Sequence, residues 1–349
     1  MGELELGWRL LSNEFVTVTG TNGKTTTVEL IGHIHREAGL PVAVAGNVGA
    51  AVSGLVGKVD RETTIVCEVS SFQLEDTLAF APEAAVLLNV TPDHLDRHGT
   101  FDAYRAAKLE IFARQGNEDI AVAPLDLGSE IGIPPIPGCA RRVCFGEGAG
   151  AALSLGAGEL WWQERPLLRV DELRLPGRHN VENSMAAAAV CLARGIEEDA
   201  VRAGLRSFAG VKHRLEEVAL RDGVRWVNDS KATNVASTLV ALDAFGAGTV
   251  HLILGGQGKG QDFSALRGPV EERCAAVYLI GEDAPRIATA LGGVSVTLRE
   301  SGDLERAVDL ARETVRPGDV VLLSPACASF DQFVDFEARG ARFRELVEG

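Results

Sequence analysis

The chain has 349 residues, of which 46% are hydrophobic and 24% are charged. A chain of this length buries more than one hydrophobic core, which predicts two domains. The formal net charge of −15 excludes a protein whose whole surface binds nucleic acid or an anionic membrane, because such a surface needs a basic field. Any anionic ligand must therefore be held by a local pocket.

The six cysteines lack the paired short spacings of a zinc site, and the chain is far longer than a disulfide-stapled miniprotein. They predict reduced thiols in a cytoplasmic protein. The N-terminus shows neither a basic segment nor a long apolar one, so no export signal is expected. The most apolar run, Met185 to Leu192, is too short to cross a bilayer and predicts a buried alanine-rich helix.

From residue 15 onward, short β-branched runs alternate with helical patterns. Four of these runs predict buried strands, at Phe15 to Thr19, Pro41 to Ala45, Thr64 to Val69 and Ala84 to Val90. The alternation predicts a parallel α/β sheet. Residues 119–175 then change character, and short extended pieces such as Arg142 to Phe145 and Leu167 to Leu175 predict a small added β layer.

Two helical patterns, from Asn180 to Arg194 and from Glu198 to Phe208, precede a second alternation that begins near Gly210. Its strands are predicted at 224–228, 249–254, 275–280 and 319–323, with a final helix after Ser329. This pattern predicts a central domain over residues 15–210 and a second, Rossmann-like doubly wound domain over residues 211–349. Because no Ser- or Pro-rich linker separates them, we expect close coupling and a ligand in the cleft between the two domains.

The strongest local signal is a segment rich in glycine and hydroxyl groups between the first strand and its helix. It reads Thr19-Gly20-Thr21-Asn22-Gly23-Lys24-Thr25-Thr26-Thr27. Such a loop curls backbone N–H groups around phosphate oxygens, while Lys24 supplies a point charge and Thr25 a ligand for Mg²⁺. The fit to G-x-x-x-x-G-K-(S/T) is incomplete, since Val18 occupies the first glycine position. Glycine-rich turns also occur without nucleotide, but the coincidence of Gly, Lys and three hydroxyls favours ATP.

Polar residues follow the next two predicted strands. Glu68 closes an apolar run, so it should lie at the carboxyl end of its strand beside the phosphate loop and hold Mg²⁺; the alternative is a surface carboxylate at the sheet edge. His94 lies in the polar segment after the following strand and predicts a metal or phosphate contact, although single histidines are often structural. Lys108, on a predicted helix from Phe101 to Ala113, would by itself be a surface lysine.

Several segments taken together resemble the Mur ligases. In the first half these are TGTNGKTTT (19–27), GNVG (46–49), EVSSFQLE (68–75), NVTPDHLDRHG (89–99), YRAAKLEIF (104–112) and GRHNVEN (177–183). In the second half they are HRLE (213–216), NDSKATN (228–234), GGQGKGQDF (255–263) and SPACASFDQF (324–333). NDSKATN resembles the branch that adds D-glutamate, and the resemblance extends from residue 3 to residue 349.

This resemblance implies a P-loop-type ATPase domain and an enzyme that uses ATP and Mg²⁺ to add D-glutamate to UDP-N-acetylmuramoyl-L-alanine through an acyl phosphate. It implies a catalytic set of Lys24, His94, Lys108 and Arg214. The ATP-binding residues would be Gly20, Thr21, Asn22, Gly23, Lys24, Thr25, Thr26, Asn180, Asn183, Arg214, Asp229 and Lys231. The metal site would comprise Thr25, Glu68, His94 and Lys108, with Lys108 carbamylated. The substrates would be bound by Asn47, His94, Thr233, Lys259, Ser329, Phe330 and Phe336. The expected partners are these small molecules, with no nucleic acid and no membrane, and the expected state is a monomer.

Three other readings stay open. The family has an additional first domain of about one hundred residues that grips the uridine diphosphate, and residues 1–14 look like only its last helix and linker. The chain would then be an ATP-binding ligase core without activity of its own. A folylpolyglutamate-synthase-like or MurT-like ligase for another acceptor is a further alternative, against which NDSKATN and SSFQLE weigh. Single positions also have alternatives to the roles that the resemblance implies: Arg214 could be a surface charge, Phe336 part of the core and Asn180 a helix cap.

Overall fold

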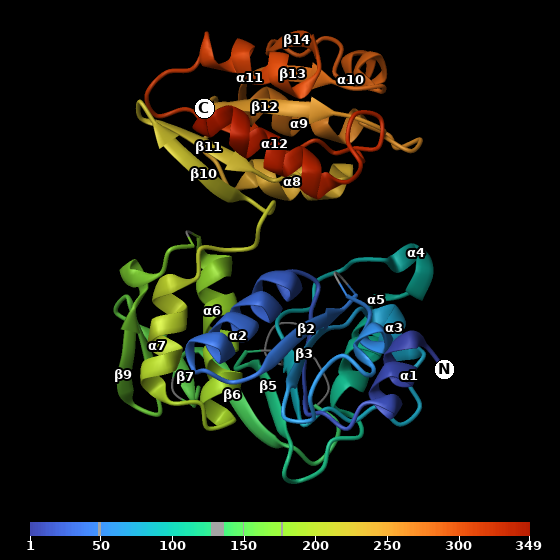
Figure 1. The fold of residues 1–349 in the computed structure, drawn as a ribbon, viewed down its shortest axis with the longest axis vertical. Coiled ribbons are helices and arrows are strands. Elements are labelled where there is room, and N and C mark those ends of the chain that lie inside the picture. Colours follow the sequence, from blue (N-terminus) through green and yellow to red (C-terminus); the bar gives the residue numbers. More distant parts are fainter. Residues whose placement is uncertain (48–49, 127–135, 149, 176) are drawn as a thin grey trace. The chain divides into compact units, whose positions relative to one another are not determined.

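The computed structural model describes residues 1–47, 50–126, 136–148, 150–175 and 177–349. The chain divides into two compact units, Met1–Ala209 and Gly210–Gly349 (Figure 1). The assignment of residues 1–14 to the end of a further domain stays a prediction. Residues 48 and 49 of the GNVG segment lie outside the described residues. Within the described ranges, no helix is both long enough and apolar enough to cross a bilayer.

The first unit is built on one sheet with the strand order β2-β3-β1-β4-β5-β6-β7-β8-β9. Its strands are β1 (Phe15–Thr19), β2 (Val42–Gly46), β3 (Thr64–Glu68), β4 (Ala84–Leu87), β5 (Ile120–Pro124), β6 (Arg141–Glu147), β7 (Leu153–Gly156), β8 (Glu159–Trp162) and β9 (Arg165–Arg169). From β2 to β7 in this order, each pair of neighbouring strands is parallel. The predicted parallel sheet is therefore confirmed, and the carboxyl ends of β1, β3 and β4 lie together at one edge.

Residues 119–175, predicted to form a small added β layer, instead contribute strands β5 to β9 to the same sheet. β8 pairs antiparallel with β7 and with β9, so the added β structure forms the far end of the sheet. The strand predicted to reach Leu175 ends at Arg169, because the chain turns there into a short 3-10 helix, Val170–Glu172. β4 likewise ends at Leu87, three residues before the predicted end at Val90.

Helices cover both faces of the first sheet. They are α1 (Glu3–Leu10), α2 (Lys24–Glu37), α3 (Ser71–Glu75), α4 (Leu95–His98), α5 (Phe101–Leu109), α6 (Arg178–Ala193) and α7 (Glu198–Ser207), with 3-10 turns at Val52–Leu55 and Glu110–Phe112. α2, α6 and α7 pack against one another on one face, and α3 packs against α5 on the other. The alanine-rich run in α6 is buried, as predicted. α5 ends earlier than the predicted Ala113, since its last turn becomes the second 3-10 helix.

The second unit has a six-stranded sheet in the order β10-β11-β15-β12-β13-β14. Its strands are β10 (Glu216–Arg221), β11 (Val224–Asn228), β12 (Val250–Gly255), β13 (Cys274–Ile280), β14 (Thr297–Gly302) and β15 (Val320–Leu323). Its helices are α8 (Val235–Asp243), α9 (Arg267–Arg273), α10 (Ala284–Ala290), α11 (Leu304–Arg312) and α12 (Phe336–Glu348), with a 3-10 turn at Ser264–Leu266. All pairs are parallel except β10 with β11, which confirms a doubly wound sheet.

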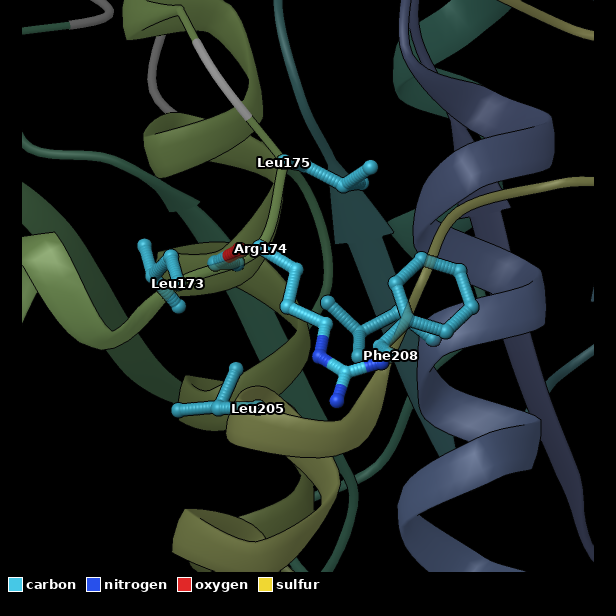
Figure 2. A pocket seen from close by; sticks show the side chains of 7 residues that line it. Leu173, Arg174, Leu175, Leu205 and Phe208 are labelled. Atoms are coloured by element: carbon cyan, nitrogen blue, oxygen red, sulfur yellow. The ribbon is translucent and has the colours of Figure 1, made fainter. Parts of the chain in front are cut away.

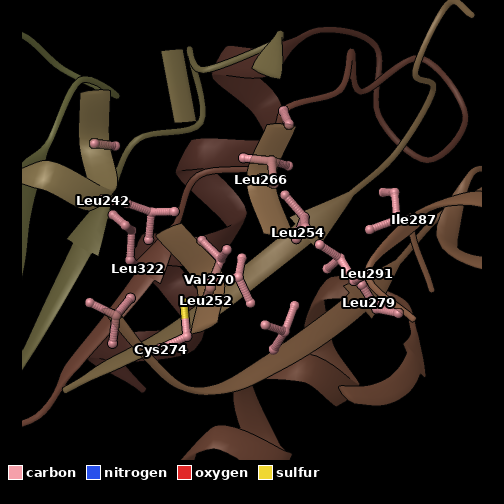
Figure 3. Close-up of a cluster of buried hydrophobic side chains, with 14 of the residues drawn as sticks. Leu242, Leu252, Leu254, Leu266, Val270, Cys274, Leu279, Ile287, Leu291 and Leu322 are labelled. Carbon is pink, nitrogen blue, oxygen red and sulfur yellow. The ribbon is translucent and has the colours of Figure 1, made fainter. Parts of the chain in front are cut away.

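Two hydrophobic clusters flank the second sheet because successive strand residues point to opposite faces. Leu252, Leu254 and Leu322 belong to one cluster, which α8, α9 and α10 cover (Figure 3). Ile253 and Leu323 belong to the other, which α11 and α12 cover. All six cysteines are free thiols, as predicted.

Candidate active site

The phosphate loop connects β1 to α2, and two asparagines from other elements fix its shape. Gly23 has a φ of 84°, and a Cβ at this position would lie 2.2 Å from Asn183 Oδ1, so only glycine fits. The Asn89 carboxamide accepts hydrogen bonds from the N–H groups of Thr21 (3.1 Å) and Asn22 (2.9 Å). It also donates to the Asn22 carbonyl at 3.2 Å. Asn89 follows β4, the strand next to the loop, and the sequence alone predicts no role for it.

Two lysines converge on one carbonyl of this loop. Lys24 Nζ donates to the carbonyl oxygens of Gly20 (2.9 Å) and Thr21 (2.8 Å). Lys108 Nζ, arriving from α5, donates to the same Gly20 oxygen at 2.7 Å. The two amines thus lie beside the loop that is predicted to bind phosphate, where positive charge attracts an anion.

Lys108 is buried, which corrects the residue-level reading of a surface lysine. Only 2% of Lys108 is exposed, and its amine lies 4.6 Å from the centre of the Tyr104 ring. Burial, together with the charge of Lys24, lowers the pKa of Lys108 from 10.5 to about 7, while Asp93 acts in the opposite direction. A large part of the Lys108 population is therefore a neutral, nucleophilic amine near neutral pH.

Glu68 ends β3 beside the start of α2, as its place in the sequence predicted. Thr25 Oγ1 donates to Glu68 Oε2 at 2.6 Å, and Asn47 Nδ2 donates to Glu68 Oε1 at 3.4 Å. A hydroxyl and a carboxylate beside a phosphate loop are the oxygen ligands that Mg²⁺ takes in nucleotide sites, where phosphates and waters complete the shell. Thr25 and Glu68 therefore fit the ion.

His94 contacts its neighbour Asp93 and the ring of Phe72. Half of its side chain is exposed, its backbone is left-handed with a φ of 51°, and its Nε2 lies 3.6 Å from Asp93 Oδ2. Its ring packs 5.0 Å from that of Phe72. Among the described residues, no group of three or more His, Cys, Asp or Glu side chains is arranged to hold a metal. The proposed role of His94 in the metal site stays a prediction.

Beside His94, a buried histidine missed in the sequence analysis links α3 to α4. His98 Nε2 lies 3.0 Å from Ser71 Oγ, and His98 Nδ1 lies 3.0 Å from Glu75 Oε1. Its ring stacks on Phe72 with centroids 5.2 Å apart. These contacts attach the segment that contains His94 to α3.

The N-terminal half of α6 faces the phosphate loop. Asn183 is buried and lies close to Gly23, and Asn183 Nδ2 is 3.5 Å from Asn180 Oδ1 one helical turn away. Thr26, in the first turn of α2, is half-buried. The two predicted asparagines of α6 are thus next to each other, and Asn183 is next to the loop.

In the second unit, Asp229 lies immediately after β11 and is almost fully buried. Ser324 Oγ donates to Asp229 Oδ2 at 2.8 Å, and the Leu215 N–H donates to Oδ1 at 3.2 Å. Burial raises the pKa of Asp229 to about 7, although these two hydrogen bonds and the charge of Arg214 act in the opposite direction. Arg214 is exposed, and Lys231 Nζ lies 5.8 Å from the centre of the Phe336 ring.

The residues predicted to bind glutamate come from three segments of the second unit. Lys259 Nζ lies 5.5 Å from the centre of the exposed Phe330 ring. Ser329 is buried, and within the described residues its hydroxyl has no hydrogen-bond partner. Thr233 lies just before α8 and Phe336 begins α12, both half-buried. A buried hydroxyl without a partner is costly, so it is a candidate contact for a bound polar ligand.

Arg339 of α12, which the sequence analysis missed, holds two of these segments together. Only 1% of it is exposed. Its guanidinium donates to Ser230 Oγ (2.9 Å), to the Ser230 carbonyl (2.9 Å) and to the Cys327 carbonyl (3.0 Å). Burial lowers the pKa of Arg339 to about 10, so the side chain stays charged at neutral pH. NDSKATN and SPACASF are therefore joined through α12.

The pocket shown in Figure 2 lies elsewhere, among α2, α6 and α7. Leu173, Arg174, Leu175, Leu205 and Phe208 line it together with Leu30 and Ser184. None of the predicted site residues belongs to this set. Its mainly leucine lining is typical of packing between helices.

Two family models match the chain. Residues 18–191 match the Mur ligase middle domain, and residues 213–327 match the Mur ligase, glutamate ligase domain. A "UDP-N-acetylmuramoylalanine--D-glutamate ligase" from Pelotomaculum thermopropionicum is 45% identical over 99% of this chain and 77% of its own length. A protein of the same name from Acidobacterium capsulatum is 44% identical, over 99% of this chain and 76% of its own length.

Solved structures of Mur ligases and of FolC share the fold. A MurF structure from Acinetobacter baumannii has a TM-score of 0.73 at 20% identity, covering 98% of this chain and 78% of that one. E. coli FolC in complex with ADP has a TM-score of 0.66 at 18% identity, covering 99% of this chain and 93% of that one. The family models cover most of both units, and the relatives are similar over nearly the whole chain. This chain belongs to the Mur ligase family.

Proposed function

We propose that this chain joins the carboxyl group of UDP-N-acetylmuramoyl-L-alanine to the amine of D-glutamate, with cleavage of ATP to ADP and phosphate. Mur ligases form amide bonds in this ATP-dependent way, and the similar proteins from P. thermopropionicum and A. capsulatum are named for this reaction. The observation that carries the proposal is the convergence of Lys24 and Lys108 on the Gly20 carbonyl, next to the pair formed by Thr25 and Glu68.

The reaction has two steps. An oxygen of the acceptor carboxylate attacks the γ-phosphorus of ATP, the bond to the bridging oxygen breaks, and ADP leaves an acyl phosphate behind. The neutral amine of D-glutamate then attacks the acyl carbon, the carbon–oxygen bond to phosphate breaks, and the amine loses a proton. The products are the amide, ADP and inorganic phosphate. In both steps two anionic reactants must approach, so positive groups at the transferred phosphoryl group lower the barrier.

The residues of the first unit suit the phosphate side of this reaction. When nucleotide binds, Lys24 would exchange its hydrogen bonds to loop carbonyls for phosphate oxygens. Asn89 holds the shape of the loop through the N–H groups of Thr21 and Asn22, and the N terminus of α2 would face the phosphates. Thr25 and Glu68 would hold Mg²⁺, with His94 as a further proposed ligand. The ion would supply additional positive charge at the phosphates.

Lys108 is proposed to be carbamylated. The lowered pKa of Lys108, about 7, leaves a neutral amine whose nitrogen can attack the carbon of CO₂. A nitrogen–carbon bond forms, one carbon–oxygen π bond of CO₂ breaks, the nitrogen loses one proton to solvent, and the neutral amine becomes an anionic carbamate. The anion would be close to Lys24, with which Lys108 shares the Gly20 carbonyl, so the repulsion between the two amines would become attraction.

The second unit is proposed to supply the remaining contacts. Arg214, Asp229 and Lys231 would contact ATP, and Lys259, Ser329, Phe330 and Phe336 would bind D-glutamate with Thr233. The lysine and the free hydroxyl of Ser329 are suited to a carboxylate. Asn47 and His94 would contact the muramoyl substrate. We further propose that the enzyme acts as a cytoplasmic monomer in the synthesis of peptidoglycan precursors, and so supports cell shape and division.

The test is phosphate release from ATP by this 349-residue chain in the presence of UDP-N-acetylmuramoyl-L-alanine and D-glutamate, with each omitted in turn. We expect release only with both, and none when L-glutamate replaces D-glutamate. ATP binding without substrate-dependent release would instead favour a ligase core that is inactive by itself. Release with another acceptor and amino acid would favour a different member of the family.

Lys24→Ala should lower the rate of phosphate release by about 10²- to 10³-fold, because a charge at the transferred phosphoryl group is lost. The matched control is Lys58→Ala, since Lys58 is an exposed lysine of the same unit and should leave the rate unchanged. Equal rates for both variants would contradict the assigned role of the loop lysine.

A further inference from the structure

Gln261 connects three segments of the second unit through its carboxamide. Its Nε2 donates to the carbonyl oxygens of Gly258 (3.0 Å) and Ala326 (3.1 Å). Its Oε1 accepts from the N–H of Val235 at 3.0 Å. Both N–H groups and the carbonyl oxygen of the side chain are therefore used. Gln261 is half-buried, so solvent replaces these bonds only in part.

Each of the three segments contains a residue proposed to bind glutamate. Val235 is the first residue of α8 and follows the NDSKATN segment with Thr233. Gly258 precedes Lys259 in the loop after β12. Ala326 lies three residues before Ser329. One side chain thus fixes the spacing of three backbones that carry these residues.

Two of these segments have a backbone conformation that side chains disfavour. Lys259 has a φ of 51° and Ala326 has a φ of 56°, and a left-handed conformation at a residue other than glycine costs about 1–2 kcal/mol. Such a conformation persists only where the surroundings determine it. The hydrogen bonds of Gln261 to the Gly258 and Ala326 carbonyls are part of those surroundings.

Backbone hydrogen bonds also join the two loops. Gln257 and Ala328 exchange two hydrogen bonds, at 2.9 Å and 3.0 Å, and the Gly255 N–H donates to the Pro325 carbonyl at 2.9 Å. These bonds align the two loops with each other but do not reach α8. Among the described residues, Gln261 is the side chain whose hydrogen bonds join both loops to the start of α8.

We infer that Gln261 is a positioning residue for the glutamate side of the active site. It sets Lys259, Ser329 and Thr233 at the separations needed for the two carboxylates of the amino acid. It touches no reacting atom. The inference rests on the proposed function. Gln261 determines how well glutamate binds, and its loss does not change the nucleotide site.

The test compares Gln261→Met and Gln261→Glu with the unaltered chain. Methionine keeps the length of the side chain and loses all three hydrogen bonds. Glutamate keeps the acceptor for Val235 but places a carboxylate against two carbonyl oxygens. For both variants we expect KM for D-glutamate to rise about tenfold or more, and KM for ATP to change less than about twofold. Hydrogen exchange at the amides of Val235 and of residues 326–329 should become faster.

Glu271→Ala is the matched control. Glu271 accepts hydrogen bonds from Ser295 N–H (3.0 Å) and Oγ (2.6 Å), so it also joins two segments, but at the amino ends of β13 and β14. This variant should leave KM for D-glutamate unchanged. Gln261 would be a general structural residue if both KM values rose together, or if Glu271→Ala raised KM for D-glutamate as much. Unchanged kinetics would also overturn the inference.

Failure of the proposed function can be told apart from failure of the role inferred for Gln261. If the unaltered chain shows no glutamate-dependent phosphate release, the proposed function fails whatever the variants do. The positioning claim is then decided by hydrogen exchange alone: faster exchange at Val235 and 326–329 in Gln261→Met supports it, and unchanged exchange overturns it.

Discussion

Lys108 places an amine where the charged form is disfavoured, and this has a measurable effect on stability. The pKa of Lys108 falls from 10.5 to about 7 on folding. Below pH 7 both folded and unfolded chains hold the proton, so the full cost of burying the charge is present. As pH rises from 7 to 10.5 the folded chain releases its proton first, and the cost disappears.

Lys108→Met should therefore stabilise the first unit. The gain in the free energy of unfolding should be largest at pH 6, at up to about 5 kcal/mol, and should shrink steadily as pH rises towards 10. The Gly20 carbonyl keeps its hydrogen bond from Lys24, so methionine leaves that oxygen with a partner. Hydrogen exchange of β1 and α5 amides in CO₂-free buffer measures this unit alone. If the difference in stability between the variant and the unaltered chain grew with pH, burial would not disfavour the charged form of Lys108.

Some residues of the site could be predicted from the sequence and others could not. The difference is whether local sequence pattern or tertiary packing determines the position of the side chain. Lys24 begins the helix after the first strand and Glu68 ends a strand, as the alternating pattern of the sequence predicts. Burial of Lys108 depends on tertiary packing of α5, so local pattern alone indicated a surface residue. Gln261 and Arg339 bond to backbone groups more than ten residues away, and no local signal marks them.

At the scale of elements, one buried carboxylate attaches α1 to residues 78–80 of the first unit. Glu5 is fully buried and accepts hydrogen bonds from the N–H groups of Leu78, Ala79 and Phe80. Burial by itself raises the pKa of Glu5, but the hydrogen bonds from Arg9 and from these backbone groups outweigh it and lower the pKa below 4.5. The Glu5 carboxylate is therefore ionised at neutral pH and accepts hydrogen bonds from the N–H groups of three consecutive residues.

Glu5→Gln should loosen this attachment by about 1–3 kcal/mol at pH 7, since an amide NH₂ would replace one acceptor against backbone donors. Because the pKa is lowered by folding, the stabilisation by Glu5 is present above 4.5 and is lost as pH falls through the folded value. The difference between the variant and the unaltered chain should thus shrink in acid.

Hydrogen exchange at residues 78–80 reports the loosening directly. Glu3→Gln is the control, because Glu3 is an exposed carboxylate of the same helix that accepts a hydrogen bond from Ser53 N–H at 2.7 Å. Its effect should stay within about 0.5 kcal/mol. An effect of Glu3→Gln as large as that of Glu5→Gln would show that α1 is held by its surface charges.

Strands at the centre and at the edges of the sheets differ in how clearly the sequence shows them. β1 and β3 are buried at every position and read as unbroken apolar or β-branched runs. β10 and β14, at the two edges of the second sheet, were missed because their residues are mostly half-buried or exposed and include several charges. An edge strand packs on one side only, so its hydrophobic signal is weak.

At the scale of the whole molecule, the chain contains two separate hydrophobic cores of adequate size. The core of the first unit includes residues of α1, α3 and α5 with the sheet, and the second unit has a cluster on each face of its own sheet. In the described parts of the chain, none of these three clusters contains residues of both units. Each unit should therefore fold without the other.

The fragments 1–209 and 210–349 test this division and the proposed distribution of the site. Each should show its own cooperative thermal transition by calorimetry, because each keeps its core. The first should bind a non-hydrolysable ATP analogue, since the phosphate loop and the pair of Thr25 and Glu68 belong to it. Neither fragment alone should release phosphate, because the proposed reaction also needs Arg214, Asp229 and Lys231 of the second unit. If 1–209 folds but does not bind the analogue while the full chain does, nucleotide affinity depends on the second unit. If 1–209 turns over ATP with both substrates present, the roles proposed for the second unit are wrong.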